Sequence, residues 1–579
     1  MEKFNMIING VTVEATKGET VLQVAKRVGV KIPTLCYTEM ATTGLTIKPM
    51  TCRVCEIEID GKIMAGCVAP AKEGAVIVTN SKEAVAARRG RVEALLACHP
   101  NECLGCDKNL NCELQAIAAD MGIKKATCRN TPKYEIDNST PSLVFDKNKC
   151  INCKRCENVC SKVQTVGALA CPAKFGEEGT VQTASGAPLG DTGCVLCGQC
   201  ALVCPTGAIT IKDDTQRLMD AIACPDTVVI TQMAPAVRAG MGQAFDIPAG
   251  VDVIGKINTG LRMLGFDKVY NTTFSADVTI MEEGTELIKR LTDTTGKYKL
   301  PLITSCCPAW VKFAEHNYGD LLDHVSSTKS PQQIFGALAK TYLPEKLGVD
   351  AKKIFSVSIM PCTAKKYEAI RPEMAGDVDL VVTTVEIANM FKAAGIDLPA
   401  LTESKTDEFM GEGTGAGVIF GVTGGVTEAA VRTVHKVVTG NELPSFDLEI
   451  CRGFEGGEIK TADVKIGDIT VKVAIAHELR NAKILMDQIR EGTSPYQFIE
   501  IMACPSGCIN GGGQPSSMCN NDIVGKRSNV LYNSDKNNPL RRSHDSPDVK
   551  RVYDEFLGEP YKGKAYDLLH TTYTSKPVK

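Results

Sequence analysis

The sequence lacks any long apolar segment. No stretch approaches the ~18 consecutive apolar residues of a membrane-spanning helix, so no membrane span is expected. The opening residues, MEKFNMIINGVTVEATKGE, contain neither the apolar segment nor the cleavage site of a secretion signal. We therefore expect a cytoplasmic protein.

The chain also lacks a strong charge of either sign. Its 65 Lys and Arg nearly balance 68 Asp and Glu, which leaves a formal net charge of -3. That balance gives no argument for a nucleic acid or membrane partner. No flavin or nucleotide motif is apparent either, because GVTGGV (residues 421–426) lacks the strand–GxGxxG–helix context.

Cysteine, in contrast, is abundant, with 26 in 579 residues. The hydrophobic share of 44% can form a core without disulfides, and the length predicts about three to five domains. Many cysteines without a secretion signal indicate a reducing compartment, where they serve as metal ligands or catalysts.

The first cysteine group follows a small strand–strand–helix unit. MIINGVTVEA predicts a β-hairpin that turns at Asn9–Gly10, and ETVLQVAKRVGV has helical spacing. Four cysteines with the spacing C-x15-C-x2-C-x11-C come next: Cys36, Cys52, Cys55 and Cys67. On a small β-rich domain they indicate a [2Fe–2S] cluster. Zinc is the alternative, although zinc sites more often use two C-x2-C pairs.

The second group has the spacing H-x3-C-x2-C-x5-C, at His99, Cys103, Cys106 and Cys112. By itself it could be a zinc knuckle, and a lone histidine before a proline is usually structural. Between other cluster motifs, it resembles the [4Fe–4S] site with one histidine and three cysteines found in large redox enzymes. An imidazole ligand changes the charge of such a cluster and so its potential.

The third group is a repeated C-x2-C-x2-C-x3-C pattern typical of two-cluster ferredoxins. In this pattern three thiolates hold one [4Fe–4S] cluster and the fourth reaches the other cluster. The two runs are Cys150, Cys153, Cys156 and Cys160, then Cys194, Cys197, Cys200 and Cys204. Clusters of this kind only move electrons, so the remaining residues should hold a catalytic site.

From about residue 221 the pattern changes. Short β-branched runs alternate with helical stretches, which predicts parallel sheets flanked by helices. Cysteines follow three of these runs: Cys306 and Cys307 after PLIT, Cys362 after VSIM, and Cys504 and Cys508 after FIEIM. Loops at strand ends are where such folds build their sites.

Three segments in this half, TSCCPAW (304–310), MPCTAKKYE (360–368) and MACPSGCINGGGQP (502–515), resemble the signatures of [FeFe]-hydrogenases. The resemblance covers essentially the whole chain. It is closest to monomeric, clostridial-type members with four accessory clusters, in a less-studied branch with TSCCPAW. It implies the reaction 2 H+ + 2 e- ⇌ H2 at an H-cluster. That cofactor joins a [4Fe–4S] cluster to a two-iron unit with CO, cyanide and a dithiolate amine.

The resemblance also implies an organisation and partners. The expected fold is α+β and multidomain: a β-grasp [2Fe–2S] domain at 1–80, a one-histidine/three-cysteine [4Fe–4S] domain at 81–140, a two-cluster ferredoxin domain at 141–220 and an α/β catalytic domain at 221–579. One [2Fe–2S] and three [4Fe–4S] accessory clusters would pass electrons to the H-cluster. The implied partners are ferredoxin or a similar small carrier, H2 and protons, and maturation proteins for the two-iron unit.

By the same resemblance, Cys307, Cys362, Cys504 and Cys508 match the ligands of the [4Fe–4S] half, and Cys508 also bridges to the two-iron unit. Cys306 matches a thiol that passes protons to the bridging amine, so the two adjacent thiols would face different ways. An unperturbed thiol pKa of ~8.5 suits such a relay.

Further residues match the surroundings of the two-iron unit. Lys365 matches a lysine that donates to a cyanide ligand, and Met360 and Met502 match apolar packing. Pro235 and Ala236, in MAPAVR, resemble another loop of the pocket, where some members carry serine at the position of Ala236. On pattern alone, a lone lysine is more often a solvated charge and a methionine more often core.

MEEGTELIKR (281–290) predicts a helix with Glu283, Glu286 and Arg290 on one face. Pattern alone favours an exposed ion-pair face. By resemblance, these three residues and Ser326 match a proton path from the surface to Cys306.

Six cysteines have no ligand spacing and are expected to be small buried hydrophobic residues: Cys98, Cys128, Cys171, Cys224, Cys451 and Cys519. Three other functions are compatible with parts of the sequence. An electron-transfer subunit of a larger dehydrogenase would lack the three C-terminal motifs. A eukaryotic cluster-assembly protein would lack the complete set around the two-iron unit. A hydrogen sensor is chemically possible, but no sensory domain is apparent.

Overall fold

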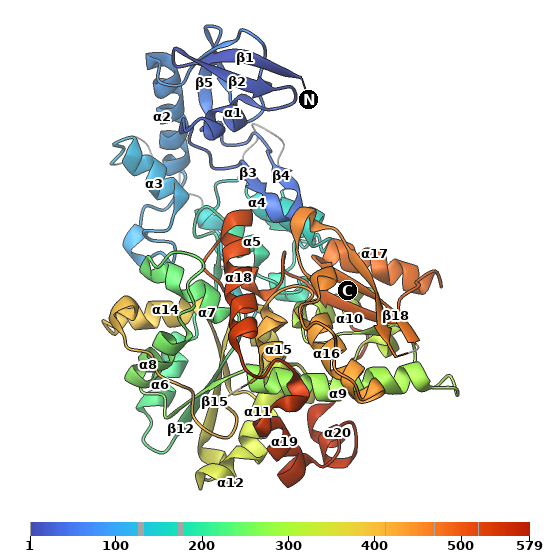
Figure 1. The fold of residues 1–579 in the computed structure, drawn as a ribbon. Helices are drawn as coiled ribbons and strands as arrows, with labels where there is room; N and C mark the ends of the chain where they lie inside the picture. The colour runs from blue at the N-terminus through green and yellow to red at the C-terminus, as the bar shows by residue number, and fades with distance from the viewer. Residues whose placement is uncertain are drawn as a thin grey trace.

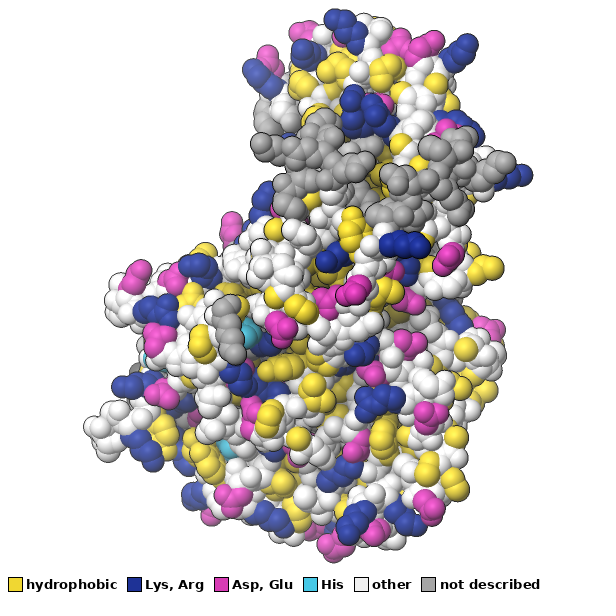
Figure 2. Space-filling view, turned by 180° about the vertical axis from the view of Figure 1, so that it is seen from behind, with side chains coloured by type: hydrophobic (Ala, Val, Ile, Leu, Met, Phe, Trp, Pro, Cys, Tyr) yellow, Lys and Arg dark blue, Asp and Glu magenta, His cyan; other side chains and the backbone are white. Residues whose placement is uncertain are grey.

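The computed structural model describes residues 2–124, 133–171, 179–411, 413–467, 469–518 and 520–578. Cys128 and Cys519 lie outside these residues. The N-terminal residues form a lobe at the top of Figure 1, and the C-terminal half forms the larger body below it. None of the helices described is long and apolar enough to cross a membrane. Figure 2 shows basic and acidic side chains interspersed over one face, as expected from the small net charge.

The N-terminal lobe is built on one five-stranded sheet in the order β2-β1-β7-β5-β6. Its strands are β1 (Lys3–Ile8), β2 (Val11–Thr16), β5 (Glu56–Ile59), β6 (Lys62–Ala65) and β7 (Val76–Val78). The predicted hairpin joins β1 to β2 through Asn9 and Gly10, both with positive φ. Helix α1 (Val21–Arg27) begins with a capping box at Thr20 and buries Val21 and Val24 against the sheet.

The second and third cysteine groups lie between the lobe and the body. Helices α2 (Lys82–Ala97) and α3 (Glu113–Asp120) flank the second group. The third group is built around a strand pair, β8 (Leu143–Phe145) with β11 (Ile209–Ile211), and around two short helices. These helices are α4 (Arg155–Asn158) and α5 (Gln199–Val203), and each carries one cysteine of a run.

The body contains two four-stranded sheets. The first, in the order β13-β12-β15-β16, is wholly parallel, and its strands are buried on both faces. Its strands are β12 (Val228–Met233), β13 (Lys268–Asn271), β15 (Ile354–Met360) and β16 (Leu380–Thr383).

The second sheet, in the order β14-β19-β18-β17, differs from the prediction at one edge. Strands β14 (Leu302–Ile303), β19 (Phe498–Met502) and β18 (Ile469–His477) are parallel, but β17 (Lys460–Ile466) pairs antiparallel with β18. Only two residues separate β17 from β18, and so short a connection permits only antiparallel pairing.

Helices cover both sheets (Figure 1). Those that matter for the site are α9 (Thr273–Thr292), α10 (Pro308–Asn317), α11 (Pro331–Thr341), α13 (Ala364–Ala369), α16 (Gly425–Thr439), α18 (Asn521–Asn537) and α20 (Gly563–Leu569). The others in the body include α6 (Thr215–Ala223), α8 (Ile254–Leu264), α14 (Thr384–Ala393), α17 (Leu479–Arg490) and α19 (Pro547–Val552).

A buried ion-pair network fastens the C-terminal helices to the body. Arg432 of α16 donates to Asp535 of α18 at 2.9 and 2.8 Å and to Glu428 at 2.6 Å. Arg452 and Arg541 complete the network. Because these cations neutralise the acids, we assign the cluster a structural role and not a metal-binding one.

The prediction for the spare cysteines is partly wrong. Cys451 is buried and Cys171 is half-buried, but Cys98 and Cys224 are exposed. Cys98 and Cys224 are the C-caps of α2 and α6, where each chain leaves its helix at the surface.

Candidate active site and metal centres

A cavity of about 80 Å3 lies where strands β12, β14, β15 and β19 end. All five cysteines of the three signature segments line it. So do the four apolar residues predicted for the pocket, Pro235, Ala236, Met360 and Met502. Among the described residues that line it, Lys365 alone is charged. The site is therefore an apolar chamber with sulfur ligands and one cation.

Four thiols converge in this chamber: Cys307, Cys362, Cys504 and Cys508. Burial, followed by the charge of Cys307, raises the pKa of Cys362 to about 12. Burial and the neighbouring sulfurs also raise the pKa of Cys504 well above its usual range. Thiolates this close together are stable only with a cationic partner, which is the donor chemistry that suits an iron–sulfur cluster.

The two adjacent cysteines face different surroundings. Cys306 packs with the apolar group that contains Ile280 and Met502, whereas Cys307 packs with the group that contains Trp310. The Cys307 Sγ accepts from the Ala503 amide at 3.4 Å. The chain's one tryptophan, Trp310, fixes this turn by donating from Nε1 to the Thr304 carbonyl at 3.1 Å.

The thiol of Cys306 differs from the unperturbed one assumed from the sequence. Burial, and next the charge of Glu283, raise its pKa well above the usual range. Cys306 is therefore a neutral thiol that holds its proton at rest.

Lys365 is held rigidly at the chamber wall. Its Nζ donates to the Glu368 carboxylate at 2.7 Å, the Ser330 hydroxyl at 2.8 Å and the Cys306 carbonyl at 3.1 Å. Burial by itself would lower the pKa of Lys365, but Glu368 outweighs burial and the pKa is raised. The lysine is thus a fixed cation and not a solvated one. Sequence reasoning missed Glu368, although it lies one helical turn after Lys365 in MPCTAKKYE.

Part of the chamber wall has no signal in the sequence. Phe420 and Gly421 line it opposite the cysteines' loops. A Cβ on Gly421 would lie 2.4 Å from Leu531 of α18 and 3.3 Å from the Ala236 Cβ. A larger residue would have to displace the Leu531 side chain, so glycine lets α18 and the loop at Ala236 pack closely against this turn.

The acidic residues of α9 are buried, so an exposed ion-pair face is wrong. Glu286 accepts from Arg290 at 2.6 and 3.1 Å and from the Ser326 hydroxyl at 2.9 Å. Neither carboxylate oxygen of Glu283 has a hydrogen-bond partner among the described residues. Burial, and next the charge of Glu286, raise the pKa of Glu283 to about 8, and weak interactions with Ser326 and the Ser305 amide only partly offset this. Glu283 can therefore gain and lose a proton near neutral pH.

The first cysteine group is gathered in the N-terminal lobe. The Sγ atoms of Cys36 and Cys52 lie 3.3 Å apart, and all four thiols of the group are buried. Cys55 first, then burial, and then the charges of Cys36 and Cys52 raise the pKa of Cys67, which fits four neighbouring sulfurs. This donor set suits a cluster or a metal ion.

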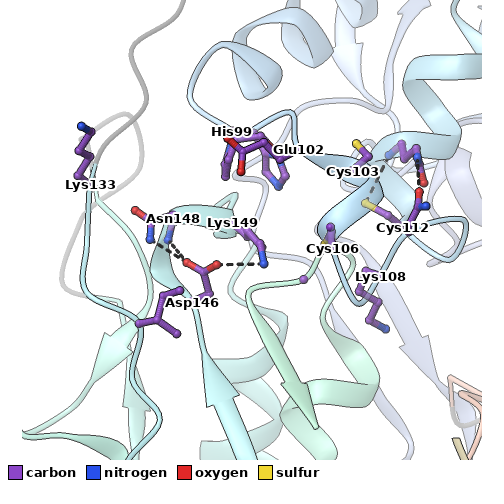
Figure 3. A pocket seen from close by; sticks show the side chains of 16 residues that line it. His99, Glu102, Cys103, Cys106, Lys108, Cys112, Lys133, Asp146, Asn148 and Lys149 are labelled. Atoms are coloured by element: carbon purple, nitrogen blue, oxygen red, sulfur yellow. Dashed lines mark hydrogen bonds and ion pairs between the residues drawn. The ribbon is translucent and has the colours of Figure 1, made fainter. Parts of the chain in front are cut away.

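The second group lines a cavity of about 380 Å3, in which Figure 3 shows Cys103, Cys106 and Cys112 on one side and His99 across from them. The His99 Nδ1 lies 2.9 Å from the Pro100 carbonyl, while its buried Nε2 has no partner among the described residues. A ligating histidine typically donates its other ring N–H to a carbonyl in this way. His99 therefore fits a metal ligand better than a structural histidine.

The repeated run forms two small cavities with exchanged cysteines. Cys204 joins the first three cysteines of the first run, and Cys160 joins the first three of the second. Each cavity is therefore lined by three cysteines from one run and the fourth from the other.

Comparison with known proteins agrees with this arrangement. The matching families are the 2Fe-2S iron-sulfur cluster binding domain (2–82), the NADH-ubiquinone oxidoreductase-G iron-sulfur binding region (88–127), the 4Fe-4S dicluster domain (149–208), the iron only hydrogenase large subunit, C-terminal domain (227–512), and the iron hydrogenase small subunit (521–576).

Two full-length relatives are similar throughout. The NADP-reducing hydrogenase subunit HndD of Solidesulfovibrio fructosivorans is 44% identical, over 99% of this chain and 99% of its own length. Iron hydrogenase 1 of Clostridium pasteurianum is 38% identical, over 98% and 99%. Among solved structures, an apo form of the [FeFe]-hydrogenase HydA1 from Chlamydomonas reinhardtii matches with a TM-score of 0.57 and 41% identity, over 63% of this chain and all of that one.

The sheets, the cysteine chamber and these matches define an iron–sulfur oxidoreductase that acts on hydrogen. The chain belongs to the [FeFe]-hydrogenase family, whose reaction is 2 H+ + 2 e- ⇌ H2. The prediction of a multidomain α+β fold with iron–sulfur domains for electron relay is confirmed.

Proposed function

We propose that the chamber holds the H-cluster. Cys307, Cys362, Cys504 and Cys508 would bind its [4Fe–4S] half, with Cys508 as the bridge to the two-iron unit. The observation that carries this proposal is the convergence of these four thiols, two buried and two half-buried, on one apolar cavity. When bound, the H-cluster supplies the site at which protons and electrons combine to form H2.

Protons would reach the chamber along one buried row. Glu286 exchanges a proton with Glu283 through the Ser326 hydroxyl, and Glu283 reloads the Cys306 thiol. Arg290 holds Glu286 in place. The raised pKa of Glu283, about 8, supports this, because a carboxylic acid with that pKa both holds and releases a proton near neutral pH.

The remaining wall would orient the two-iron unit. Lys365 would present a fixed ammonium group to a cyanide ligand, and its longest hydrogen bond, 3.1 Å to the Cys306 carbonyl, would be the one most easily given up. Met360, Met502, Pro235 and Ala236 pack around the unit and exclude water.

The other donor sets would hold the accessory clusters: one [2Fe–2S] at Cys36, Cys52, Cys55 and Cys67, and three [4Fe–4S] at His99 with Cys103, Cys106 and Cys112, at Cys150, Cys153, Cys156 and Cys204, and at Cys194, Cys197, Cys200 and Cys160. The family matches support domain boundaries near residues 80, 140 and 220. Assignment to the TSCCPAW branch remains part of this proposal.

For the electron partner we propose ferredoxin or a similar small carrier, and maturation proteins would supply the two-iron unit. The second candidate is a partner subunit in an NADP-reducing assembly, because a relative named as such a subunit matches along both full lengths. The many cysteines that gather in candidate cluster sites support a location in the reducing cytoplasm.

Cys508→Ser tests the assignment of the chamber. The variant should lose the infrared bands of iron-bound CO and cyanide, because a serine oxygen is a poor bridge between the two halves of the cofactor. EPR signals of the accessory clusters should persist. Cys451→Ser is the control, since Cys451 is a buried cysteine of the same half of the chain that lines none of the cysteine cavities. A normal two-iron spectrum in Cys508→Ser would contradict the assignment.

His99→Cys tests the second metal centre. A fourth thiolate should keep the cluster but lower its reduction potential, because imidazole is neutral and thiolate is anionic. His99→Ala should lose the cluster. EPR-monitored redox titration measures both effects, and an unchanged spectrum in His99→Ala would remove His99 from the ligand set.

A further inference from the structure

We propose that His570, which follows α20, is the outer proton-exchanging residue of the path and connects Glu286 with solvent. This inference rests on the proton path proposed above. It assigns a positioning and relay role to a side chain from the segment that matches the small-subunit family.

Arg290 cannot serve as the proton-exchanging residue at the outer end of the path. A guanidinium group does not give up its proton in proteins. Its donors are moreover taken by Glu286 and by the carbonyls of Lys299, Asp323 and Val325, at 2.7, 2.9 and 3.3 Å. Arg290 therefore orients Glu286, and the path needs a different group at its outer end.

Glu286 also has a hydrogen-bonded neighbour besides Arg290 and Ser326, namely Ser327. Glu286 Oε2 accepts from the Ser327 amide at 3.2 Å and lies 3.4 Å from the Ser327 hydroxyl. The same hydroxyl lies 2.8 Å from His570 Nδ1. A hydroxyl donates to one partner at a time, so rotation of this group links Glu286 to the imidazole.

The other ring nitrogen of His570 is held by the carboxylate of Glu282. His570 Nε2 lies 2.9 Å from Glu282 Oε2, and Glu282 also accepts from the Tyr553 hydroxyl at 2.5 Å and the Tyr561 amide at 2.6 Å. A carboxylate held in this way fixes the Nε2–H tautomer and leaves Nδ1 as the acceptor toward Ser327. It also stabilises the imidazolium that forms when Nδ1 takes up a proton.

Two tyrosine rings cover His570 on its solvent side. Tyr566 stacks on the imidazole with ring centroids 4.7 Å apart, and Tyr561 meets its edge at 4.8 Å. Tyr566 is 42% exposed and His570 itself is 8% exposed, so the imidazole lies close to solvent. The titratable groups that face this pocket are Glu282, Glu286, Lys289, Tyr553, Tyr561 and Tyr566.

The backbone keeps this register. The Thr571 amide donates to the Ser327 carbonyl at 2.8 Å, and the Lys329 amide donates to the Leu569 carbonyl at 2.8 Å. These two backbone hydrogen bonds join residues 327–329 to residues 569–571, one on either side of His570. The C-terminal segment thus completes the path as well as covering the body.

The proposed transfer conserves every proton. During H2 formation, imidazolium Nδ1–H donates to Ser327 Oγ while the Ser327 hydroxyl proton passes to Glu286. His570, which is 8% exposed, then regains a proton at Nδ1 from water. During H2 oxidation the same steps run in reverse.

His570→Gln separates a relay from a scaffold. Glutamine can keep hydrogen bonds to Ser327 and Glu282 but cannot titrate. We expect turnover to fall at least about tenfold, with unchanged melting temperature and unchanged CO and cyanide bands. A purely structural histidine would predict near wild-type turnover in this variant. His316→Gln is the matched control, because His316 also contacts the C-terminal segment, at the Lys576 carbonyl, but faces no part of the path.

Chemical rescue gives a second and independent test. In His570→Ala, added imidazole should restore turnover in a dose-dependent way, whereas pyrazole, of similar shape but far weaker as a base, should not. Calorimetry should also detect imidazole binding to His570→Ala purified without the two-iron unit, but not to the wild type. Normal turnover in His570→Gln, or the absence of both binding and rescue in His570→Ala, would overturn the inference.

The Cys306 and Glu283 variants distinguish a failure of the His570 inference from a failure of the whole proton path. If Cys306→Ala and Glu283→Gln leave turnover intact, the path itself is wrong. If those two variants are slow and His570→Gln is fast, the path stands and His570 is not its outer group.

Discussion

Cys306→Ala is expected to lower hydrogen turnover about a hundredfold or more while every cluster stays bound. The thiol lines the chamber but packs with a different apolar group from Cys307, so it can lose its sulfur without removing a ligand. Alanine leaves no group on this wall that can carry a proton from Glu283. Turnover with a chemical reductant and infrared spectra of the same sample give the two measurements.

The control for that variant is Cys98→Ala, an exposed cysteine at the end of α2. It should match the wild type in both measurements. Near wild-type turnover in Cys306→Ala with intact infrared bands would exclude the relay. Loss of the bands would instead show that Cys306 holds the cofactor.

Glu283→Gln should be nearly as slow, by about 10^2- to 10^4-fold, because glutamine keeps the shape of the side chain but cannot cycle a proton. Asp277→Asn is the matched control on the same helix. Asp277 is buried too, but its carboxylate is committed to Thr414 and Ser543. Its replacement should change melting temperature and leave the rate of proton delivery unchanged.

The same substitution makes a prediction for stability against pH. Because burial raises the pKa of Glu283 from 4.5 to about 8, its neutral form is the one the fold favours. Its contribution to stability is complete below about pH 4.5 and is lost as the pH rises to 8, by up to about 1.4 kcal/mol for each pH unit. Glu283→Gln should therefore lose less stability than the wild type across this interval. Equal pH dependence in the two proteins, from urea unfolding, would show that Glu283 is already ionised.

Much of the metal chemistry could be predicted from the sequence because ligand spacing is local. A C-x2-C-x2-C run must place three sulfurs together wherever the chain folds. The spacing H-x3-C-x2-C-x5-C singled out His99 in the same way, and the structure places it in one cavity with its three cysteines. The fold of the β1–β2 hairpin was equally local, because Asn9–Gly10 specifies its turn.

The parts that sequence reasoning missed depend on contacts between distant segments. Ser330 binds Lys365 from the start of another helix, and Gly421 is fixed by Leu531 more than a hundred residues later. No spacing rule connects such residues, because their proximity is set by how the sheets and helices pack. The raised pKa of Cys306 was missed for a related reason, since burial is a property of the assembled chamber.

The exchanged cysteines of the two-cluster region make the assembly and the oxidative damage of its two cluster sites interdependent. Since Cys204 and Cys160 each line the other run's cavity, neither half of the repeat is a self-sufficient unit. Oxidation of a single run would deprive both sites of sulfur, so damage should spread from one centre to its neighbour. For the same reason, deleting one run would not remove a single cluster and leave the other intact. Both cluster sites would lose ligands, and electron transfer from the N-terminal lobe to the cysteine chamber would be interrupted.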